Sequence, residues 1–233
     1  MGGHIDLYLD IASLYSYITL IQVLNNQDLL KQHSVEIEVH PFLLGAVNGA
    51  TGNKPPWVVP AKAAFGAHDS RRSLAAVGLS NVSPPGDLME AGKTQFALRG
   101  LSYIKSHFPV STYLSAWRAL FHAFWTEHRP PNNADALRAA LDAAKLFTSA
   151  EVEEIVKAAG AAEYKDVLRR TTEEAVGRGA FGAPWFWVTN AATGRSEPFF
   201  GSDRWHHMYE FLGLPFQAFA LLPPDVKGSG SKL

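Results

Sequence analysis

The order of the predicted elements is the feature of this sequence that most restricts its fold. Residues 4–10 and 35–39 alternate apolar and polar side chains, which is typical of half-buried strands. Between them, apolar residues from Tyr17 to Leu24 recur at helical spacing. The chain therefore opens as β-α-β, and the length of the connection favours a parallel pair of strands with a right-handed crossover.

The middle of the chain is predicted to be almost entirely helical. Residues 45–56 are rich in Gly, Asn and Pro, and we expect them to form a loop. Thr148 and Glu151 form a capping-box motif, which marks the start of a helix. The candidate helices span residues 60–77, 94–107, 111–127, 133–146, 149–158 and 161–177.

Strand character returns after Pro184. Residues 185–189 and 197–200 flank a turn at Asn190–Gly194 and predict a hairpin, and a last helix is expected from Ser202 to about Leu212. The economical interpretation is an α/β sheet that is split in sequence by an inserted helical block.

The composition excludes several classes of protein. Apolar residues make up 47% of the 233 residues, enough for a large core, whereas 21 Lys and Arg nearly balance 22 Asp and Glu. This balance gives no strong positive electrostatic potential for holding a nucleic acid. It points to a small-molecule ligand or a protein partner. No apolar run approaches the roughly 18 residues of a membrane span, and the N-terminus lacks the basic region of a secretory signal.

The chain contains no cysteine, so it offers no disulfide, no thiolate metal site and no cysteine nucleophile. A thiol that reacts here must arrive with a ligand. His206 and His207 are adjacent and would point apart on a helix, and His122 and His128 lack a ligand spacing, so we expect no metal site.

Ser13 and Ser16 follow the first strand at the spacing of a redox CxxC pair. The N-terminus of the following helix favours an anion, because its N–H groups are unpaired and its dipole end is positive. Ser13 is either a plain helix cap or the donor of a hydrogen bond to a bound thiolate. Both interpretations stay open on this evidence.

Three further segments carry candidate binding residues. Pro184 follows a Gly-rich turn and precedes a strand, a common place for a cis peptide. Ser202 suits a carboxylate and Asp203 an ammonium, although Ser202 also suits plain capping. In the loop at 52–56 and just after it, Asn53 or Lys62 could meet a second carboxylate, or the segment is a solvated loop.

In this order, the motifs resemble the kappa-class glutathione transferases, a DsbA-like group that also contains bacterial 2-hydroxychromene-2-carboxylate isomerases. The resemblance covers nearly the whole chain. It implies a thioredoxin-like domain at 1–43 and 178–233, interrupted by a helical domain at 44–177. The segments that carry it are Ser13–Ser16, GNKPP at 52–56, Pro60-Ala-Lys62, Thr171–Ala175, GAFGAP at 179–184 and FGSDR at 200–204.

The resemblance also implies a role for each site residue. Ser13 would be the catalytic serine that hydrogen-bonds the glutathione thiolate, and Ala183, before a cis-Pro184, would pair its backbone with the cysteinyl unit. The other residues implied to bind glutathione are Ser202 and Asp203 at the γ-glutamyl end, Asn53 and Lys62 at the glycyl part, and Tyr15.

The function that follows is a glutathione S-transferase acting on hydrophobic electrophiles, expected as a homodimer. Alternatives are a glutathione-dependent cis-trans isomerase, and a non-enzymatic binder of glutathione or lipophiles, which is favoured by Leu14 where the family commonly has proline. The chain ends in Ser231-Lys232-Leu233, which is either the tripeptide of a peroxisomal import signal or a chance ending, and we favour the signal. We therefore expect an import receptor as a partner and the peroxisome as the location, with the mitochondrion or cytosol as alternatives.

Overall fold

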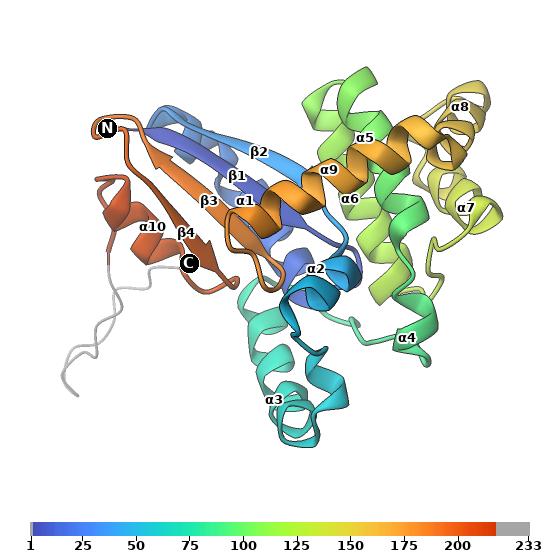
Figure 1. The fold of residues 1–233 in the computed structure, drawn as a ribbon, viewed down its shortest axis with the longest axis horizontal. Coiled ribbons are helices and arrows are strands. Elements are labelled where there is room, and N and C mark those ends of the chain that lie inside the picture. The colour runs from blue at the N-terminus through green and yellow to red at the C-terminus, as the bar shows by residue number, and fades with distance from the viewer. Residues whose placement is uncertain (1, 218–233) are drawn as a thin grey trace.

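A mixed four-stranded sheet in the order β2-β1-β3-β4 forms the centre of the computed structural model, which describes residues 2–217 (Figure 1). The strands are β1 (Gly3–Leu9), β2 (Val35–Pro41), β3 (Trp185–Asn190) and β4 (Ser196–Phe200). β1 pairs parallel with β2 and antiparallel with β3, and β3 and β4 form the predicted hairpin. The two ends of the chain thus build one sheet, as the split-sheet prediction requires.

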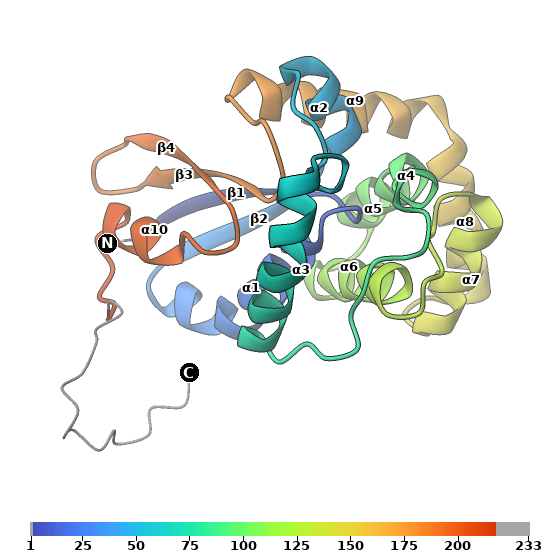
Figure 2. The ribbon, with the colours of Figure 1, turned by 90° about the horizontal axis from the view of Figure 1, so that it is seen from below.

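Helices cover both faces of this sheet (Figure 2). Leu7 and the other odd-numbered apolar residues of β1 pack into the main core with α1 (Leu14–Gln32) and α10 (Trp205–Phe211). On the opposite face, α2 (Leu44–Thr51) and α9 (Ala162–Gly177) contribute to a second, smaller buried cluster. This layered α/β arrangement confirms the predicted fold class.

The predicted helical block is also confirmed, and each predicted helix begins and ends within two residues of the observed one. The Thr148 hydroxyl accepts from the Glu151 N–H while the Glu151 carboxylate accepts from the Thr148 N–H, which completes the predicted capping box. The remaining helices are the short 3-10 helix Pro56–Val58, α3 (Pro60–Ala76), α4 (Leu88–Ala91), α5 (Gln95–His107), α6 (Val110–Trp125), α7 (Ala134–Ala144) and α8 (Ser149–Gly160).

Helix α2 corrects one expectation, because its residues were predicted to be loop. Its two glycines disfavour a helix in isolation, but Val47 is fully buried in the second cluster. The N-terminus of α2 is satisfied from a distance: the Leu44 N–H donates to the Asp10 carboxylate at 2.7 Å. Tertiary contacts therefore stabilise a helix that the local sequence does not indicate.

The last helix is a second correction. It begins at Trp205 instead of Ser202, and Arg204 precedes it without a side-chain cap. Gly201 has φ +95°, a backbone conformation that favours glycine, and its N–H donates to the Pro184 carbonyl. The chain is thus held in a turn at residues 201–203, and Ser202 is not a helix N-cap.

The helical block packs directly against the sheet. The Trp125 indole N–H donates to the Ile11 carbonyl at 2.8 Å, and the Tyr113 hydroxyl donates to the Val39 carbonyl at 2.9 Å. One buried cluster runs from β1 through α5 and α6. The division into domains at 43/44 and 177/178 stays a prediction.

Within residues 2–217, no helix is long and apolar enough to cross a bilayer.

Candidate active site

The turn between β1 and α1 places Ser13 at the N-terminus of α1. The Ser13 Oγ accepts from the Ser16 N–H at 3.2 Å, so Ser13 is a true N-cap. Its hydroxyl also donates to the Ala183 carbonyl at 3.2 Å, and the first turn of α1 holds no acidic residue. The two interpretations of Ser13 are therefore compatible, because one hydroxyl can cap the helix through its lone pair and donate its hydrogen elsewhere.

The peptide bond between Ala183 and Pro184 is cis, as the sequence predicted. Pro184 is buried and Ala183 is half-buried, directly before β3. The Ser13 hydroxyl and the cis-proline segment therefore meet, which brings together the two segments most strongly implicated by the sequence.

Tyr15 links α1 to two other segments. Its hydroxyl donates to the Asp69 carboxylate in α3. Burial raises the pKa of the Tyr15 phenol, and the charges of Asp69 and Asp203 raise it further. Tyr15 thus stays protonated and lies near Asp203, although 188 positions separate the two in sequence. Asp69 was missed by sequence reasoning, since no local motif distinguishes it from other polar residues of α3.

The predicted glycyl-binding residues are placed differently from each other. The Asn53 amide donates to the Phe181 carbonyl at 2.7 Å and therefore lies beside the cis-proline segment. Lys62 lies exposed in the first turn of α3. Among residues 2–217, no hydrogen bond or ion pair joins Lys62 to the other candidate residues. The structure brings Asn53, but not the Lys62 side chain, into contact with the site.

The turn at 201–203 contributes the last two candidate residues. Ser202 is buried, whereas Asp203 is exposed and pairs with Arg204 at 2.6 Å. The hydrogen bond from the Gly201 N–H to the Pro184 carbonyl ties this turn to the cis-proline. The two residues therefore lie next to the Ser13 region without the helix N-terminus that the sequence predicted.

Asp10 is a buried carboxyl behind the Ser13 turn that sequence reasoning missed. It accepts hydrogen bonds from the Ala12 N–H, the Leu44 N–H and the Thr94 hydroxyl. Burial raises the pKa of Asp10 to about 6 in spite of these bonds. Asp10 thereby joins the Ser13 turn to the starts of α2 and α5. An acidic residue at the end of an apolar strand was the available signal.

A second polar cluster lies on the β1 and β2 surface. Donor atoms of His4, Asp6 and Glu38 lie within 4.8 Å of one another, close enough to hold a metal ion. However, cations already pair with both carboxylates, because Arg178 lies 2.8 Å from Asp6 and Lys105 lies 2.7 Å from Glu38. We interpret this cluster as an ion-pair network that stabilises the sheet.

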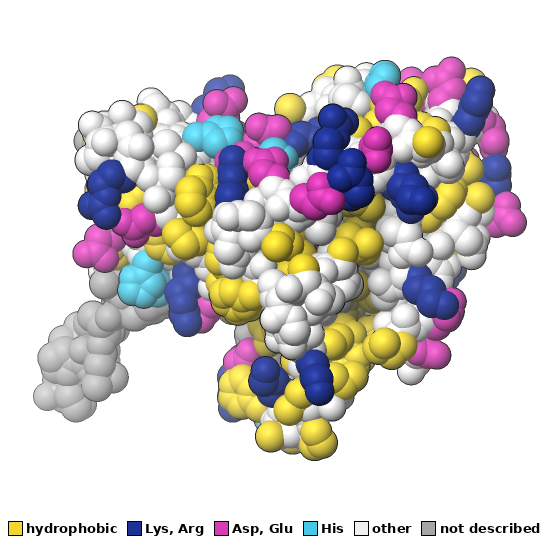
Figure 3. Space-filling model, viewed as in Figure 1, with side chains coloured by type: hydrophobic (Ala, Val, Ile, Leu, Met, Phe, Trp, Pro, Cys, Tyr) yellow, Lys and Arg dark blue, Asp and Glu magenta, His cyan; other side chains and the backbone are white. Residues whose placement is uncertain are grey.

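Apolar side chains surround the cis-proline segment. Phe181 and Phe200 are each about two-fifths exposed, and their rings lie 4.6 Å apart. A Cβ on Gly182 would lie 2.8 Å from the Phe200 ring, so a larger residue there would have to displace that exposed ring. Figure 3 also shows hydrophobic side chains gathered over α3, where Phe65 is exposed. The site thus combines a small polar centre with an apolar rim.

The arrangement is suited to holding an anion at Ser13. A hydroxyl donor and the unpaired N–H groups of a long helix stabilise negative charge, whereas the absence of cysteine from the sequence leaves the site no thiol of its own.

Comparisons with known proteins agree with the fold and with the resemblance stated above. The family model described as "DSBA-like thioredoxin domain" matches residues 4–213. Glutathione S-transferase kappa 1 of Caenorhabditis elegans is 28% identical over 245 residues, covering 98% of this chain and 97% of that protein. Glutathione S-transferase kappa 1 of Homo sapiens is 25% identical over 213 residues and 90% of each chain.

A solved structure, that of a 2-hydroxychromene-2-carboxylate isomerase, superposes with a TM-score of 0.71 at 19% identity, covering 90% of this chain and 94% of that chain. The predicted resemblance to the kappa-class group is thereby confirmed. The fold, the cis-proline before β3 and the match over residues 4–213 lead to one conclusion: the chain belongs to the DSBA-like thioredoxin domain family.

Proposed function

We propose that this protein is a glutathione S-transferase that joins the glutathione thiolate to an electrophilic carbon of a hydrophobic substrate. The observation that carries the proposal is the Ser13 hydroxyl at the N-terminus of α1, directed at the carbonyl before the cis-proline. Curated relatives that match at least nine-tenths of the chain bear the name of kappa glutathione transferases, which supports the same activity.

The energetics of thiolate formation fit this site. A free thiol has a pKa of about 8.5, so only a few per cent is ionised at neutral pH. Lowering that pKa by about two units requires roughly 2.7 kcal/mol of preferential thiolate stabilisation. A hydrogen bond from Ser13 to a charged partner contributes about 1.5–3 kcal/mol, and the N-terminus of α1 adds up to about 1 kcal/mol.

The rest of glutathione would lie along the segments that converge on Pro184. The backbone of Ala183 would pair with the cysteinyl unit. The turn with Ser202 and Asp203, which is tied to Pro184 through Gly201, would hold the γ-glutamyl end. The phenol of Tyr15, whose hydrogen is donated to Asp69, would offer its oxygen as an acceptor, and Asn53 would hold the glycyl part, with the exposed Lys62 as a second contact.

The reaction is a nucleophilic substitution. The thiol proton leaves to solvent, the sulfur lone pair forms a C–S bond, and the leaving group departs with the electron pair of the broken bond. The exposed rings of Phe181 and Phe200 offer an apolar surface for the acceptor substrate beside the sulfur position.

Conjugation of glutathione to a chlorodinitrobenzene tests the proposal. Replacing Ser13 by Ala should reduce kcat/KM by about a hundredfold, since it removes about 2–3 kcal/mol of thiolate stabilisation. Thr148→Ala is the matched control, because it also removes a helix N-cap but at α8, outside the candidate site. It should lower the melting temperature similarly and leave activity unchanged.

Glutathione consumption separates the proposed reaction from its alternatives. A transferase consumes one glutathione for each product, whereas an isomerase returns it unchanged. Product formation without glutathione loss, or glutathione binding without turnover of any electrophile, would overturn the transferase proposal.

We propose peroxisomal import through Ser231-Lys232-Leu233, which lie outside the described residues. Deleting the tripeptide should move a tagged protein to the cytosol without changing its melting temperature. Continued peroxisomal import would contradict this address. The homodimer is part of the same proposal, and light scattering on the purified protein measures it.

A further inference from the structure

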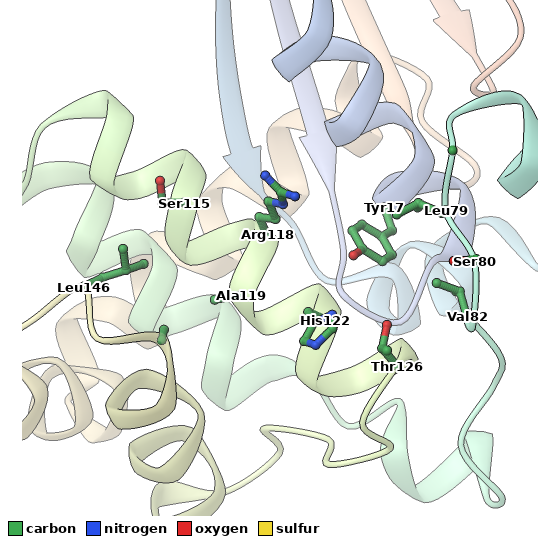
Figure 4. A pocket seen from close by; sticks show the side chains of 12 residues that line it. Tyr17, Leu79, Ser80, Val82, Ser115, Arg118, Ala119, His122, Thr126 and Leu146 are labelled. Atoms are coloured by element: carbon green, nitrogen blue, oxygen red, sulfur yellow. The ribbon is translucent and has the colours of Figure 1, made fainter.

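A cavity of about 590 Å³ that is open to solvent lies between α6, the segment that follows α3, and α1 (Figure 4). This volume is within the usual range for small-molecule sites. None of its lining residues belongs to the candidate active site described above. The cavity is therefore a separate feature, and its chemistry rests on other side chains.

Tyr17 presents a hydroxyl donor to this cavity. Its side chain is only 3% exposed, and its ring stacks on Phe121 with 5.0 Å between ring centroids. No hydrogen bond of the Tyr17 hydroxyl is found within residues 2–217. Figure 4 shows this hydroxyl turned toward α6. A hydroxyl that faces a cavity without a protein partner is a ready donor for a ligand.

Arg118 supplies a positive charge near Tyr17. It lies on α6, one turn before His122, and both residues line the cavity. In the described part of the chain, no carboxylate forms an ion pair with Arg118. Its charge acts on Tyr17, partly offsetting the burial that raises the pKa of that phenol. The neighbouring Glu127 is already paired with Arg129 at 2.5 Å.

The remaining walls include apolar side chains. Leu79 and Val82 come from the segment after α3, and Leu146 follows α7. The cavity therefore carries a cation and a hydroxyl donor, with hydrocarbon surface on either side of them. This combination matches a ligand with one anionic group and an apolar body.

We propose that this cavity binds small organic carboxylates with an apolar chain or ring. The carboxylate accepts from Arg118 and from the Tyr17 hydroxyl, and the apolar body packs against Leu79 and Val82, which lie beside Tyr17. A guanidinium and a phenol together satisfy both oxygens of one carboxylate. The site is independent of glutathione and of the proposed transferase activity.

Calorimetric titration of the full-length protein with decanoate tests this, with decanol as the neutral probe of the same length. Decanoate should bind more tightly than decanol. Arg118→Gln should weaken decanoate by at least about tenfold through the lost charge-assisted contact and change decanol by less than about threefold. Tyr17→Phe keeps the stacked ring and should lower the affinity for decanoate by about three- to tenfold.

Arg195→Gln is the matched control, because Arg195 is an exposed arginine on the β3–β4 hairpin that pairs with Glu197. It should leave both affinities unchanged. Because Arg118 is exposed, its variant is expected to fold, and melting curves check this for each protein. The proposal is overturned if wild type does not bind decanoate, if Arg118→Gln binds it as well as wild type, or if glutathione displaces it competitively.

Discussion

The Ser13 hydroxyl lies 3.2 Å from the carbonyl oxygen of Ala183, although 170 positions separate the two residues in sequence. The contact joins the N-terminus of α1 to the residue before the cis-proline, and so connects the first and last parts of the sheet. A ligand thiolate that reaches Ser13 would take over this hydrogen bond from the carbonyl.

Ser13 should control the ionisation of bound glutathione. Replacing Ser13 by Ala removes the hydroxyl donor but leaves the N-terminus of α1, so the pKa of the bound thiol should rise by at least about one unit. Thiolate absorbance across a pH titration measures this. An unchanged titration would mean that Ser13 is only a helix cap.

Asp203 should contribute to affinity and not to the fold. Its side chain is exposed, so Asp203→Asn should keep the melting temperature. It should lower the affinity for glutathione by about ten- to hundredfold, because one charge-assisted contact with the ammonium of glutathione is lost. Glu197→Gln, which removes a comparable exposed acid paired with Arg195, is the control. Equal affinities of Asp203→Asn and wild type would remove Asp203 from the site.

Asp6 should make the protein sensitive to acid. Burial alone would raise the pKa of Asp6, but hydrogen bonds from His40 and Arg178 outweigh it and hold that pKa well below its usual range. The stabilisation is therefore present above about pH 4 and is lost as the pH falls further. Asp6→Asn should lower the free energy of unfolding by on the order of 2 kcal/mol at neutral pH. It should also reduce the loss of stability toward acidic pH, the acid limb of the profile.

Urea unfolding of wild type and Asp6→Asn between pH 3 and pH 7, values chosen to span the usual carboxyl pKa of about 4, measures this difference. Asp166→Asn, which breaks an exposed ion pair with Arg169, should have little effect at any of these pH values. Parallel acid limbs for wild type and Asp6→Asn would contradict the prediction.

Asp10 should act in the opposite direction. Its pKa in the folded protein is about 6, whereas the unfolded value is close to 3.9, so the folded state retains a proton that the unfolded chain has released. The stabilisation is complete below about pH 4 and is lost as the pH rises through 6, by on the order of 3 kcal/mol.

Asp10→Asn cannot titrate, so its free energy of unfolding should lack this dependence on pH. The new amide N–H group faces other donors, so the variant should be less stable overall. Subtracting the variant's pH profile from that of wild type removes the histidine contributions common to both. A difference in unfolding free energy that stays constant from pH 4 to pH 7, values that bracket the Asp10 titration near 6, would show that folding does not raise the pKa of Asp10.

Most of the fold could be predicted because its elements carry local signals. The alternation in β1, the capping box at Thr148 and the hairpin turn each depend on neighbouring residues. Helix α2 could not be predicted, because both contacts that stabilise it are distant in sequence. Its N-terminal N–H donates to Asp10, and its Val47 packs in the second buried cluster. The start of α10 was missed for a similar reason, since Gly201 is held by the distant Pro184.

The candidate site was predicted unevenly. Ser13 and Pro184 follow from motifs, and the structure brings their segments together. Asp69 could not be predicted from the sequence, because it is part of the site only through its hydrogen bond with Tyr15, which lies on another helix. Residues that act through contacts across the fold carry no periodic or spacing signal.

The strand order has a consequence for synthesis on the ribosome. β1 is made first, yet the partner on one of its edges is β3, which emerges only after the whole helical block. A nascent chain shorter than about two hundred residues therefore carries the central strand with one edge unpaired, which is a template for pairing with other chains. Premature termination anywhere in the helical block should yield aggregating fragments instead of a smaller folded protein, and chaperone demand should peak just before β3 leaves the exit tunnel.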